Sequence, residues 1–388
     1  MSQLHIQSRL PNVGSTIFSV MSALAVQHKA VNLGQGFPDF GCDPHLLELV
    51  TEAMQQGHNQ YPPMAGVPVL RQTIAQKVAR LYGHQYDPET EITVTAGATQ
   101  GIMCAIQCSV HPGDEVIVIE PAYDCYLPAI QLAGGIPITV SMEINEQGFS
   151  VNWAKLAAKI TPKTRLIIIN SPNNPTGSVL QRSDLNALAD ILREPHNAHV
   201  LLLSDEVYEH MVYDGAQHVS VSAHPELAKR AFVISSFGKT FHVTGWKVGY
   251  VTAPAALMTE FKKVHQFTVF TVNTPMQYGL AAYLQNTAPY ENLSDFYQAK
   301  RDYFRAGLSQ SRFKLLPAQG TYFQCVDYSA ISDLPELAFA EWLTKEIGVA
   351  AIPVSAFYRS GMESGLVRFC FAKQEQTLAL ALEKLVRI

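Results

Sequence analysis

The chain has 388 residues, of which 47% are hydrophobic and 16% charged, and this composition fits a compact globular protein with a large core divided into two domains. The formal net charge of -5 and the lack of a long basic block argue against nucleic acid as a partner. The six cysteines form no CxxC pair, which argues against a metal site or a disulfide framework and favours a reducing, cytoplasmic setting.

The N-terminal region shows no sign of export. Residues 1–11 are polar and lack the apolar stretch of a signal peptide, and a helix is expected over residues 15–28. The longest apolar runs, such as residues 166–169, are too short to cross a bilayer. We therefore expect a cytoplasmic protein that does not insert into a membrane.

The middle of the chain alternates short apolar runs with longer helical patterns. Helices are expected to begin near Ala98 and near Tyr126. The expected strands cover residues 92–95, 115–119, 166–169, 200–203, 232–235 and 248–252. Because these runs are apolar on both faces, they predict an α/β fold in which helices cover both sides of a mainly parallel sheet.

The C-terminal part has a different pattern. It predicts strands over residues 321–326, 349–352 and 366–371, and helices over residues 334–347 and 374–386. This pattern indicates a smaller α+β layer.

Six short motifs occur in a fixed order along the chain. They read GAT at 97–99, NSPNNPTG at 170–177, SDEVY at 204–208, SSFGKT at 235–240, GWKVGY at 245–250, and a single arginine at 368. In this order they resemble the class I/II aminotransferases, which are pyridoxal-phosphate-dependent enzymes of fold type I. The resemblance extends from about residue 32 to residue 368.

The resemblance implies a division of the chain into three parts. Residues 1–44 would form an N-terminal segment that packs with the small domain, residues 45–289 the large cofactor-binding domain, and residues 290–388 the small C-terminal domain. A long helix over residues 290–309 would link the two domains.

Lys239 and Asp205 are the expected centre of the chemistry. The resemblance implies that Lys239 forms an imine with the aldehyde of pyridoxal 5'-phosphate and then moves the substrate proton. Asp205 follows a buried strand, where open α/β sheets bind ligands, and would keep the pyridine nitrogen protonated. Taken alone, Lys239 could be an ordinary exposed lysine and Asp205 a helix N-cap.

Three further residues are implied to touch the cofactor ring. Tyr208 and Asn174 would hydrogen-bond the phenolic oxygen, and Tyr123 would stack on the ring. Asn174 would also touch the substrate carboxylate. The alternatives to these roles are that residues 170–177 form an ordinary loop and that Tyr123 is a core residue.

The cofactor phosphate has an expected site where a strand gives way to a helix. Gly97, Ala98 and Thr99 would offer backbone N–H groups at the helix start, although a plain capped helix would look similar. Ser236 and Lys247 would complete the site with a hydroxyl and a charge. Many family members carry arginine at the position of Lys247, and lysine keeps the charge without the bidentate fork.

Tyr61 matches a tyrosine that, in the family, reaches the phosphate of the neighbouring subunit. The resemblance therefore implies a homodimer with shared active sites. The alternative for Tyr61 is an ordinary loop tyrosine.

Arg368 and Gly36 are expected to bind the substrate carboxylate. Arg368 lies on an apolar strand and needs an anionic partner, which an amino acid or a structural carboxylate could supply. Gly36 would let the backbone approach the same carboxylate. Its stretch, NLGQGFPDF at 32–40, resembles the methionine, kynurenine and glutamine-K aminotransferase branch.

The side-chain pocket is expected to be aromatic, and no second arginine is evident for a dicarboxylate. The expected lining residues are Phe18, Tyr61, Phe270 and Tyr322, each of which could instead be ordinary core. We therefore expect ping-pong transamination from methionine or aromatic amino acids to a 2-oxo acid.

Two rival functions stay open at this point. A carbon–sulfur β-lyase would use nearly the same residues and would release pyruvate and ammonia without a 2-oxo acid acceptor. A non-catalytic, ligand-sensing regulator on this fold would usually add a DNA-binding segment, and the negative charge of the chain argues against it.

Replacing Lys239 tests the chemistry directly. The Lys239→Ala variant should fold but lose transamination, because it lacks the amine that forms the imine. Circular dichroism checks folding and an amino-transfer assay checks turnover. A folded variant that retains near-wild-type turnover would contradict the assignment.

Overall fold

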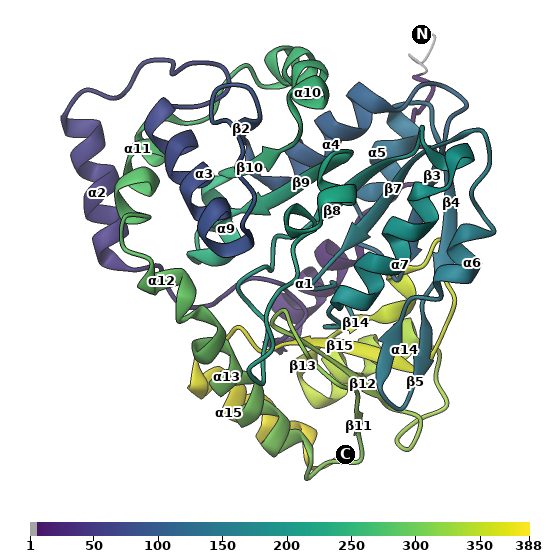
Figure 1. The fold of residues 1–388 in the computed structure, drawn as a ribbon. Coiled ribbons are helices and arrows are strands. Elements are labelled where there is room, and N and C mark those ends of the chain that lie inside the picture. Colours follow the sequence, from purple (N-terminus) through teal and green to yellow (C-terminus); the bar gives the residue numbers. More distant parts are fainter. Residues whose placement is uncertain (1–5) are drawn as a thin grey trace, which may run out of the picture.

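A seven-stranded sheet forms the centre of the structure, a computed structural model that describes residues 6–388 (Figure 1). The strands, in their spatial order, are β2 (Ile92–Thr95), β10 (Gly249–Thr252), β9 (Ala231–Ser236), β8 (Leu201–Asp205), β7 (Thr164–Asn170), β3 (Glu115–Glu120) and β4 (Ile136–Ser141). Neighbouring strands from β9 to β4 are parallel, whereas β10 is antiparallel to both β9 and β2. The predicted α/β fold with a mainly parallel sheet is confirmed.

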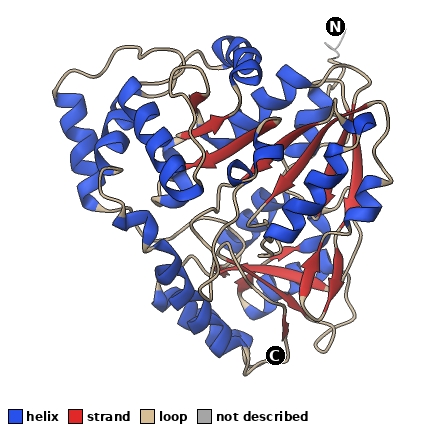
Figure 2. Cartoon of the chain, in the orientation of Figure 1, coloured by secondary structure: helices blue, strands red, loops and turns tan. Residues whose placement is uncertain are grey.

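Alternate residues of the buried strands pack into two cores, one on each face of this sheet. Ile117 and Ile167 belong to one core, and Val118 and Ile168 belong to the other. The first core includes residues of α6 (Trp153–Ala157), α7 (Arg182–Arg193) and α8 (Pro225–Ala228), and the second includes residues of α4 (Gly97–Ser109), α5 (Tyr126–Leu132) and α10 (Ala255–Thr268). The period of two along each strand therefore explains why both faces are covered by helices (Figure 2).

A third group of helices packs around the β2 edge of the sheet. They are α2 (Pro44–Gln55), α3 (Pro68–Tyr82), α9 (Phe237–Thr240), α11 (Thr274–Tyr283) and α12 (Ala288–Glu291). Shorter elements are the hairpin of β5 (Glu143–Asn145) and β6 (Gly148–Ser150) and the turns η1 (Pro195–Asn197), η2 (Val221–Ala223) and η3 (Thr244–Trp246). No helix within residues 6–388 combines the length and the apolar character that a bilayer crossing requires.

The C-terminal part forms a second layer beside the central sheet (Figure 1). Its antiparallel sheet has the order β11 (Lys314–Leu315), β12 (Phe323–Asp327), β15 (Leu366–Cys370) and β14 (Ile352–Pro353). Its helical elements are α13 (Leu293–Leu308), α14 (Glu336–Trp342), η4 (Leu343–Ile347), η5 (Val354–Phe357) and α15 (Glu375–Leu385). The long helix α13 leads from the central layer into this second layer.

The N-terminal segment folds onto this C-terminal layer. Strand β1 (Val31–Asn32) pairs in parallel with β13 (Val349–Ala350), and α1 (Ile17–Gln27) packs against the same strand. Met21 and Leu33 are buried in the hydrophobic core of the layer. The division of the chain into three parts at residues 44 and 289 stays a prediction. Residues 1–5 of the first part lie outside the residues that the structure describes.

Most predicted boundaries shift by one to three residues, and two predicted elements also differ in their structure. The strand expected over residues 349–352 is two strands, because β13 pairs with β1 while β14 pairs with β15. The helix expected over residues 334–347 begins at Glu336, after an extended Pro335, and ends as a π-helical turn.

Candidate active site

A cavity of about 470 Å³ opens where β7, β8 and β9 end, facing α1 and the C-terminal layer. Open α/β sheets bind ligands at the carboxyl ends of their strands, and this cavity lies at that edge. The predicted site residues that line it are Phe18, Gly36, Gly97, Ala98, Thr99, Tyr123, Asn174, Asp205, Tyr208, Ser236, Lys239, Lys247 and Arg368. The fold therefore brings together residues that lie far apart in the sequence.

Lys239 reaches this cavity from α9, one short turn beyond β9. Its Nζ atom donates hydrogen bonds to the Gly36 carbonyl at 3.1 Å and to the Tyr322 hydroxyl at 3.0 Å. Burial lowers the pKa of Lys239 to about 8, and the nearby Arg368 charge acts in the same direction. A lysine with this pKa is neutral far more often than an ordinary one, so its amine can act as a nucleophile or a base.

Asp205 is the last residue of β8 and is only 3% exposed. Its Oδ2 atom accepts a hydrogen bond of 2.6 Å from the Tyr126 hydroxyl, and its Oδ1 atom accepts one of 3.3 Å from the Val207 N–H. Burial raises the pKa of Asp205 to about 6, and the hydrogen bond from Tyr126 opposes this rise. No ion pair within residues 6–388 includes Asp205.

Tyr126 is a residue beside the site that the sequence analysis did not predict to act there. It is buried at the start of α5, and its ring meets the ring of Tyr123 edge to face at 5.8 Å. Nothing in its immediate sequence separates it from a core tyrosine. The one available signal was its position three residues after Tyr123, which was predicted to reach the cofactor.

The loop after β7 is tied to the end of β8. Asn170 accepts a hydrogen bond from the Asn174 N–H at 2.9 Å and donates one to the Asp205 carbonyl at 2.8 Å. Tyr208 is buried nearby, and burial raises the pKa of its phenol. The Asn170 contacts hold the backbone of Asn174 beside the end of β8, and the side chains of Asn174 and Tyr208 both line the cavity.

An anion cradle forms at the start of α4. The first helical N–H groups, from residues 97–99, have no partner within the helix. Gly97 has a φ of +74°, and a Cβ atom at this position would lie 3.1 Å from the Nζ atom of Lys247. Ser236 also lines this end of the cavity, and no ion pair within residues 6–388 includes Lys247.

Arg368 is fully buried on β15. Its Nη1 atom donates to Asn174 Oδ1 at 2.7 Å and its Nη2 atom to the Gly34 carbonyl at 2.9 Å, while Nε has no partner. The guanidinium lies 3.9 Å above the Phe323 ring and 5.3 Å from the Phe18 ring. Within the described chain it has no carboxylate partner, so this buried cation calls for an external anion.

Position 36 has too little space for a side chain, so glycine is required there. A Cβ atom at this position would lie 2.9 Å from Phe323 Cζ and 4.0 Å from Arg368 Nη2. The glycine therefore keeps the approach to the guanidinium open, while its carbonyl accepts the hydrogen bond from Lys239.

Three predicted residues do not line the cavity of their own chain. Tyr61 is 81% exposed and Phe270 is 43% exposed, and their rings meet edge to face at 5.4 Å on the surface. Tyr322, expected in the side-chain pocket, is instead buried behind Lys239, where its hydroxyl donates to the Gly36 carbonyl at 2.6 Å. Tyr322 therefore contacts the site through its hydroxyl, while its ring belongs to the hydrophobic core of the C-terminal layer, and its role toward the substrate stays a prediction.

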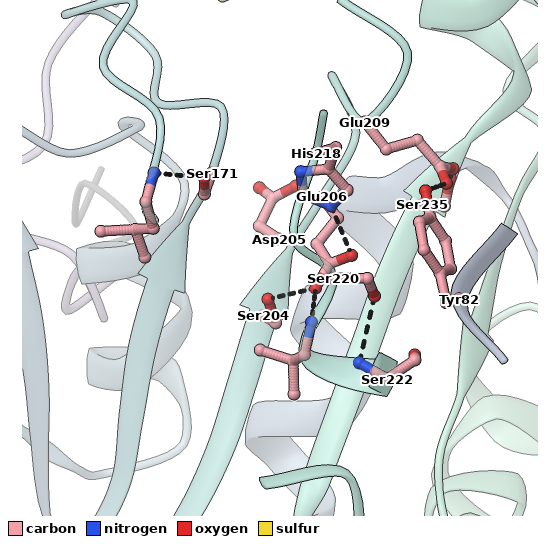
Figure 3. A network of polar contacts seen from close by, with 12 residues as sticks. Tyr82, Ser171, Ser204, Asp205, Glu206, Glu209, His218, Ser220, Ser222 and Ser235 are labelled. Atoms are coloured by element: carbon pink, nitrogen blue, oxygen red, sulfur yellow. Dashed lines mark hydrogen bonds and ion pairs between the residues drawn. The ribbon is translucent and has the colours of Figure 1, made fainter. Parts of the chain in front are cut away.

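A buried polar network holds the turn after β8, and the sequence analysis missed it (Figure 3). Glu209 accepts hydrogen bonds from the Ser235 hydroxyl and, at 2.8 Å, from Lys77. Glu206 accepts one from the Ser204 hydroxyl at 2.8 Å. Burial would raise the pKa of Glu209, but the charge of Lys77 holds it well below its ordinary value. The two carboxylates thus anchor the turn to β8 and β9.

These residues fit a phosphorylated aldehyde cofactor. Lys247 and the start of α4 form a cationic cradle, Asp205 is a buried carboxylate, and neither Lys247 nor Asp205 has an ion-pair partner within residues 6–388. Between them lies Lys239 with its lowered pKa. A phosphate, a protonated ring nitrogen and an aldehyde would satisfy these three groups in turn.

Comparison with known proteins decides the family. The sequence model described as aminotransferase class I and II matches residues 28–385. The chain belongs to the class I and II aminotransferases. These enzymes depend on pyridoxal phosphate, so the predicted enzyme class and cofactor are confirmed.

Individual relatives of this aminotransferase cover almost its whole length. Methionine aminotransferase of Escherichia coli (strain K12) is 50% identical over 380 residues, which cover 98% of this chain and 97% of that protein. Kynurenine–oxoglutarate transaminase 1 of Rattus norvegicus is 35% identical over 414 residues, covering 97% and 96%. The crystal structure of YbdL from Escherichia coli, identified as a methionine aminotransferase, has a TM-score of 0.96 at 49% identity, covering 99% of this chain and 100% of that one.

The lowered pKa of Lys239 predicts a distinctive pH dependence. In the cofactor-free enzyme, acylation of Lys239 by acetic anhydride should reach half its maximal rate near pH 8, because only the neutral amine reacts. Mass spectrometry of the labelled peptides measures the rate, with the exposed Lys155 as the internal standard. A midpoint at about 10.4, the ordinary value for lysine, would contradict the prediction.

Proposed function

We propose that this aminotransferase moves the amino group of methionine, or of an aromatic amino acid, to a 2-oxo acid in two half-reactions. The observation that carries the proposal is Arg368, a buried guanidinium without a carboxylate partner beside the rings of Phe18 and Phe323. An α-amino acid with an apolar side chain supplies both the anion and the apolar surface. The 50% identity to a methionine aminotransferase supports this donor.

The chain's own groups would hold the cofactor at both ends. The N–H groups of residues 97–99, the Ser236 hydroxyl and the Lys247 ammonium would bind the phosphate. Asp205 would pair with the protonated ring nitrogen. When bound, pyridoxal 5'-phosphate supplies an aldehyde carbon for a covalent link and a ring that withdraws electrons.

The ring between these ends would meet three polar or aromatic side chains. Tyr208 and Asn174 would donate hydrogen bonds to the phenolic oxygen, and Tyr123 would lie against the ring face. All three line the cavity, which supports these roles.

Lys239 would hold the cofactor covalently and then act as the base at the substrate's α-carbon. Once free, its Nζ atom has two hydrogen-bond partners, the Gly36 carbonyl and the Tyr322 hydroxyl, which keep the amine at the cavity. Its lowered pKa favours the neutral form that can take up a proton.

Arg368 and Asn174 would bind the α-carboxylate of the substrate. The guanidinium can pair with both oxygens of a carboxylate, and the absence of a side chain at Gly36 leaves room for the approach. The hydrogen bond between Arg368 and Asn174 orients both groups in advance.

The substrate side chain would meet a wall contributed by the N-terminal segment. Phe18 and Phe37 line this wall together with the hydroxyls of Ser19 and Ser22. Within residues 6–388, the basic residues lining the cavity are Lys239, Lys247 and Arg368, and each already has a proposed partner. This distribution supports a neutral thioether or aromatic side chain over a second carboxylate.

We further propose a cytoplasmic homodimer with shared active sites. Tyr61 would reach the phosphate in the partner's site, and Phe270 would enter the partner's substrate pocket. Their exposure, together with that of Phe267 at 87%, supports an apolar contact surface. The six cysteines are all free, which suits a reducing compartment.

Changing Arg368 should weaken substrate binding more than turnover. In Arg368→Lys the charge stays but the bidentate fork is lost, so the KM for methionine should rise by roughly 10- to 100-fold with a smaller fall in kcat. Steady-state kinetics measure both constants. Arg387→Lys, on the surface, is the control. An unchanged KM in Arg368→Lys would contradict the carboxylate role.

A single absorption experiment separates the transaminase from the carbon–sulfur β-lyase. Methionine added without an acceptor should shift the visible band of the bound cofactor to shorter wavelength, because the first half-reaction stops with the amino group on the enzyme. Addition of a 2-oxo acid should restore the band. Pyruvate and ammonia released from cystathionine without an acceptor, with no response to methionine, would support the lyase instead.

A further inference from the structure

The carboxylate of Asp205 has one side-chain hydrogen-bond partner within residues 6–388, and it is Tyr126. The phenolic hydroxyl donates to Oδ2 at 2.6 Å, a short distance typical of a hydroxyl bonded to an ionised oxygen. Both residues are buried, with exposures of 2% for Tyr126 and 3% for Asp205. The hydroxyl comes from α5 and the carboxylate from β8, so the contact is set by the packing of a helix on the sheet.

The other groups around Asp205 provide little to hold it in its ionised form. The titratable groups that face it are Tyr123, Cys125 and Tyr126 from the segment at the start of α5, Lys239 from α9, and Glu206 and Tyr208 from its own turn. Lys239 acts through charge alone, and Glu206 repels the carboxylate. The Tyr126 hydroxyl and the Val207 N–H are therefore its direct donors.

We propose that Tyr126 is a positioning residue whose hydroxyl holds Asp205 ionised and correctly turned, so that it controls how firmly the ring nitrogen of the cofactor is bound. The proposal rests on the role of Asp205 given above. Tyr126 acts through Asp205 and does not line the cavity itself.

The rival explanation is that Tyr126 only fills the core between α5 and the sheet. Its ring does belong to that hydrophobic core. The Tyr126→Phe variant distinguishes the two explanations, because it keeps the ring that fills the core and removes only the hydroxyl that donates to Asp205. The matched control is Tyr358→Phe, which removes a buried hydroxyl that has no hydrogen-bond partner of normal geometry within residues 6–388.

Cofactor affinity in a double-mutant cycle is the first test. Pyridoxal 5'-phosphate is titrated into the cofactor-free forms of the wild type, Tyr126→Phe, Asp205→Asn, the double variant and Tyr358→Phe, and absorbance reports binding. Loss of a hydrogen bond to a charged group should weaken binding in Tyr126→Phe by roughly tenfold or more. The double variant should match Asp205→Asn, because Tyr126 acts only through that carboxylate.

The pH dependence of cofactor binding is the second readout. Tyr126 opposes the rise in the pKa of Asp205, which lies at about 6, so removing its hydroxyl raises that pKa further. The carboxyl group then becomes neutral at a higher pH as acid is added. Cofactor affinity should therefore begin to fall at a higher pH in Tyr126→Phe than in the wild type. In Tyr358→Phe the fall should begin at the wild-type pH. Because the cofactor phosphate titrates in the same way in both variants, this control separates its titration from that of Asp205.

Each outcome of these measurements is decisive. The proposal would be overturned if Tyr126→Phe weakened cofactor binding equally in the wild type and in Asp205→Asn. It would also be overturned if the fall of affinity in acid began at the same pH in Tyr126→Phe and the wild type. Either result would leave Tyr126 as a packing residue. Unchanged affinity in Tyr126→Phe would overturn it as well. If Asp205→Asn binds the cofactor like the wild type, the proposed role of Asp205 is wrong. This result is distinguishable from a failure of the Tyr126 proposal, because Tyr126 is intact in that variant.

Discussion

The parallel pairing of β7, β8 and β9 is the constraint on which the site depends. The register sets Asn170 directly opposite Asp205, and Asp205 opposite Ile234. Three loops therefore start from one edge of the sheet and carry their polar side chains into one cavity. A register slip of one residue would turn Asp205 to the other face of the sheet, away from Tyr126.

Buried charge divides this molecule into a structural part and a functional part. Lys77 and Glu209 satisfy each other behind the site, and breaking such a pair costs about 3–5 kcal/mol because one charge is left alone. Arg368 and Asp205 are as deeply buried but have no ion-pair partner within residues 6–388. The fold bears the free-energy cost of these two buried charges, and the ligands proposed above would offset it on binding.

The sequence predicted the parts of the site that depend on local motifs. The strands that end at Asp205 and before Lys239, and the loop that carries Asn174, lie close to their expected places. The sequence did not predict the contacts between distant segments. Tyr126 meets Asp205 only because α5 packs on the central sheet, and Tyr322 lies behind Lys239 because its ring packs in the C-terminal core.

The wall proposed to face the substrate side chain comes largely from one short stretch of chain. Between residues 18 and 37, six residues line the cavity, and this stretch is held by β13 and the C-terminal core rather than by the central sheet. The groups proposed for the cofactor come from the large layer. With the roles proposed above, specificity and chemistry would be encoded in separate segments, so substitutions in the first would alter the substrate range over evolution while the second stays intact. Gly36 marks the boundary, because its carbonyl accepts a hydrogen bond from Lys239 while a Cβ atom at this position would face Arg368.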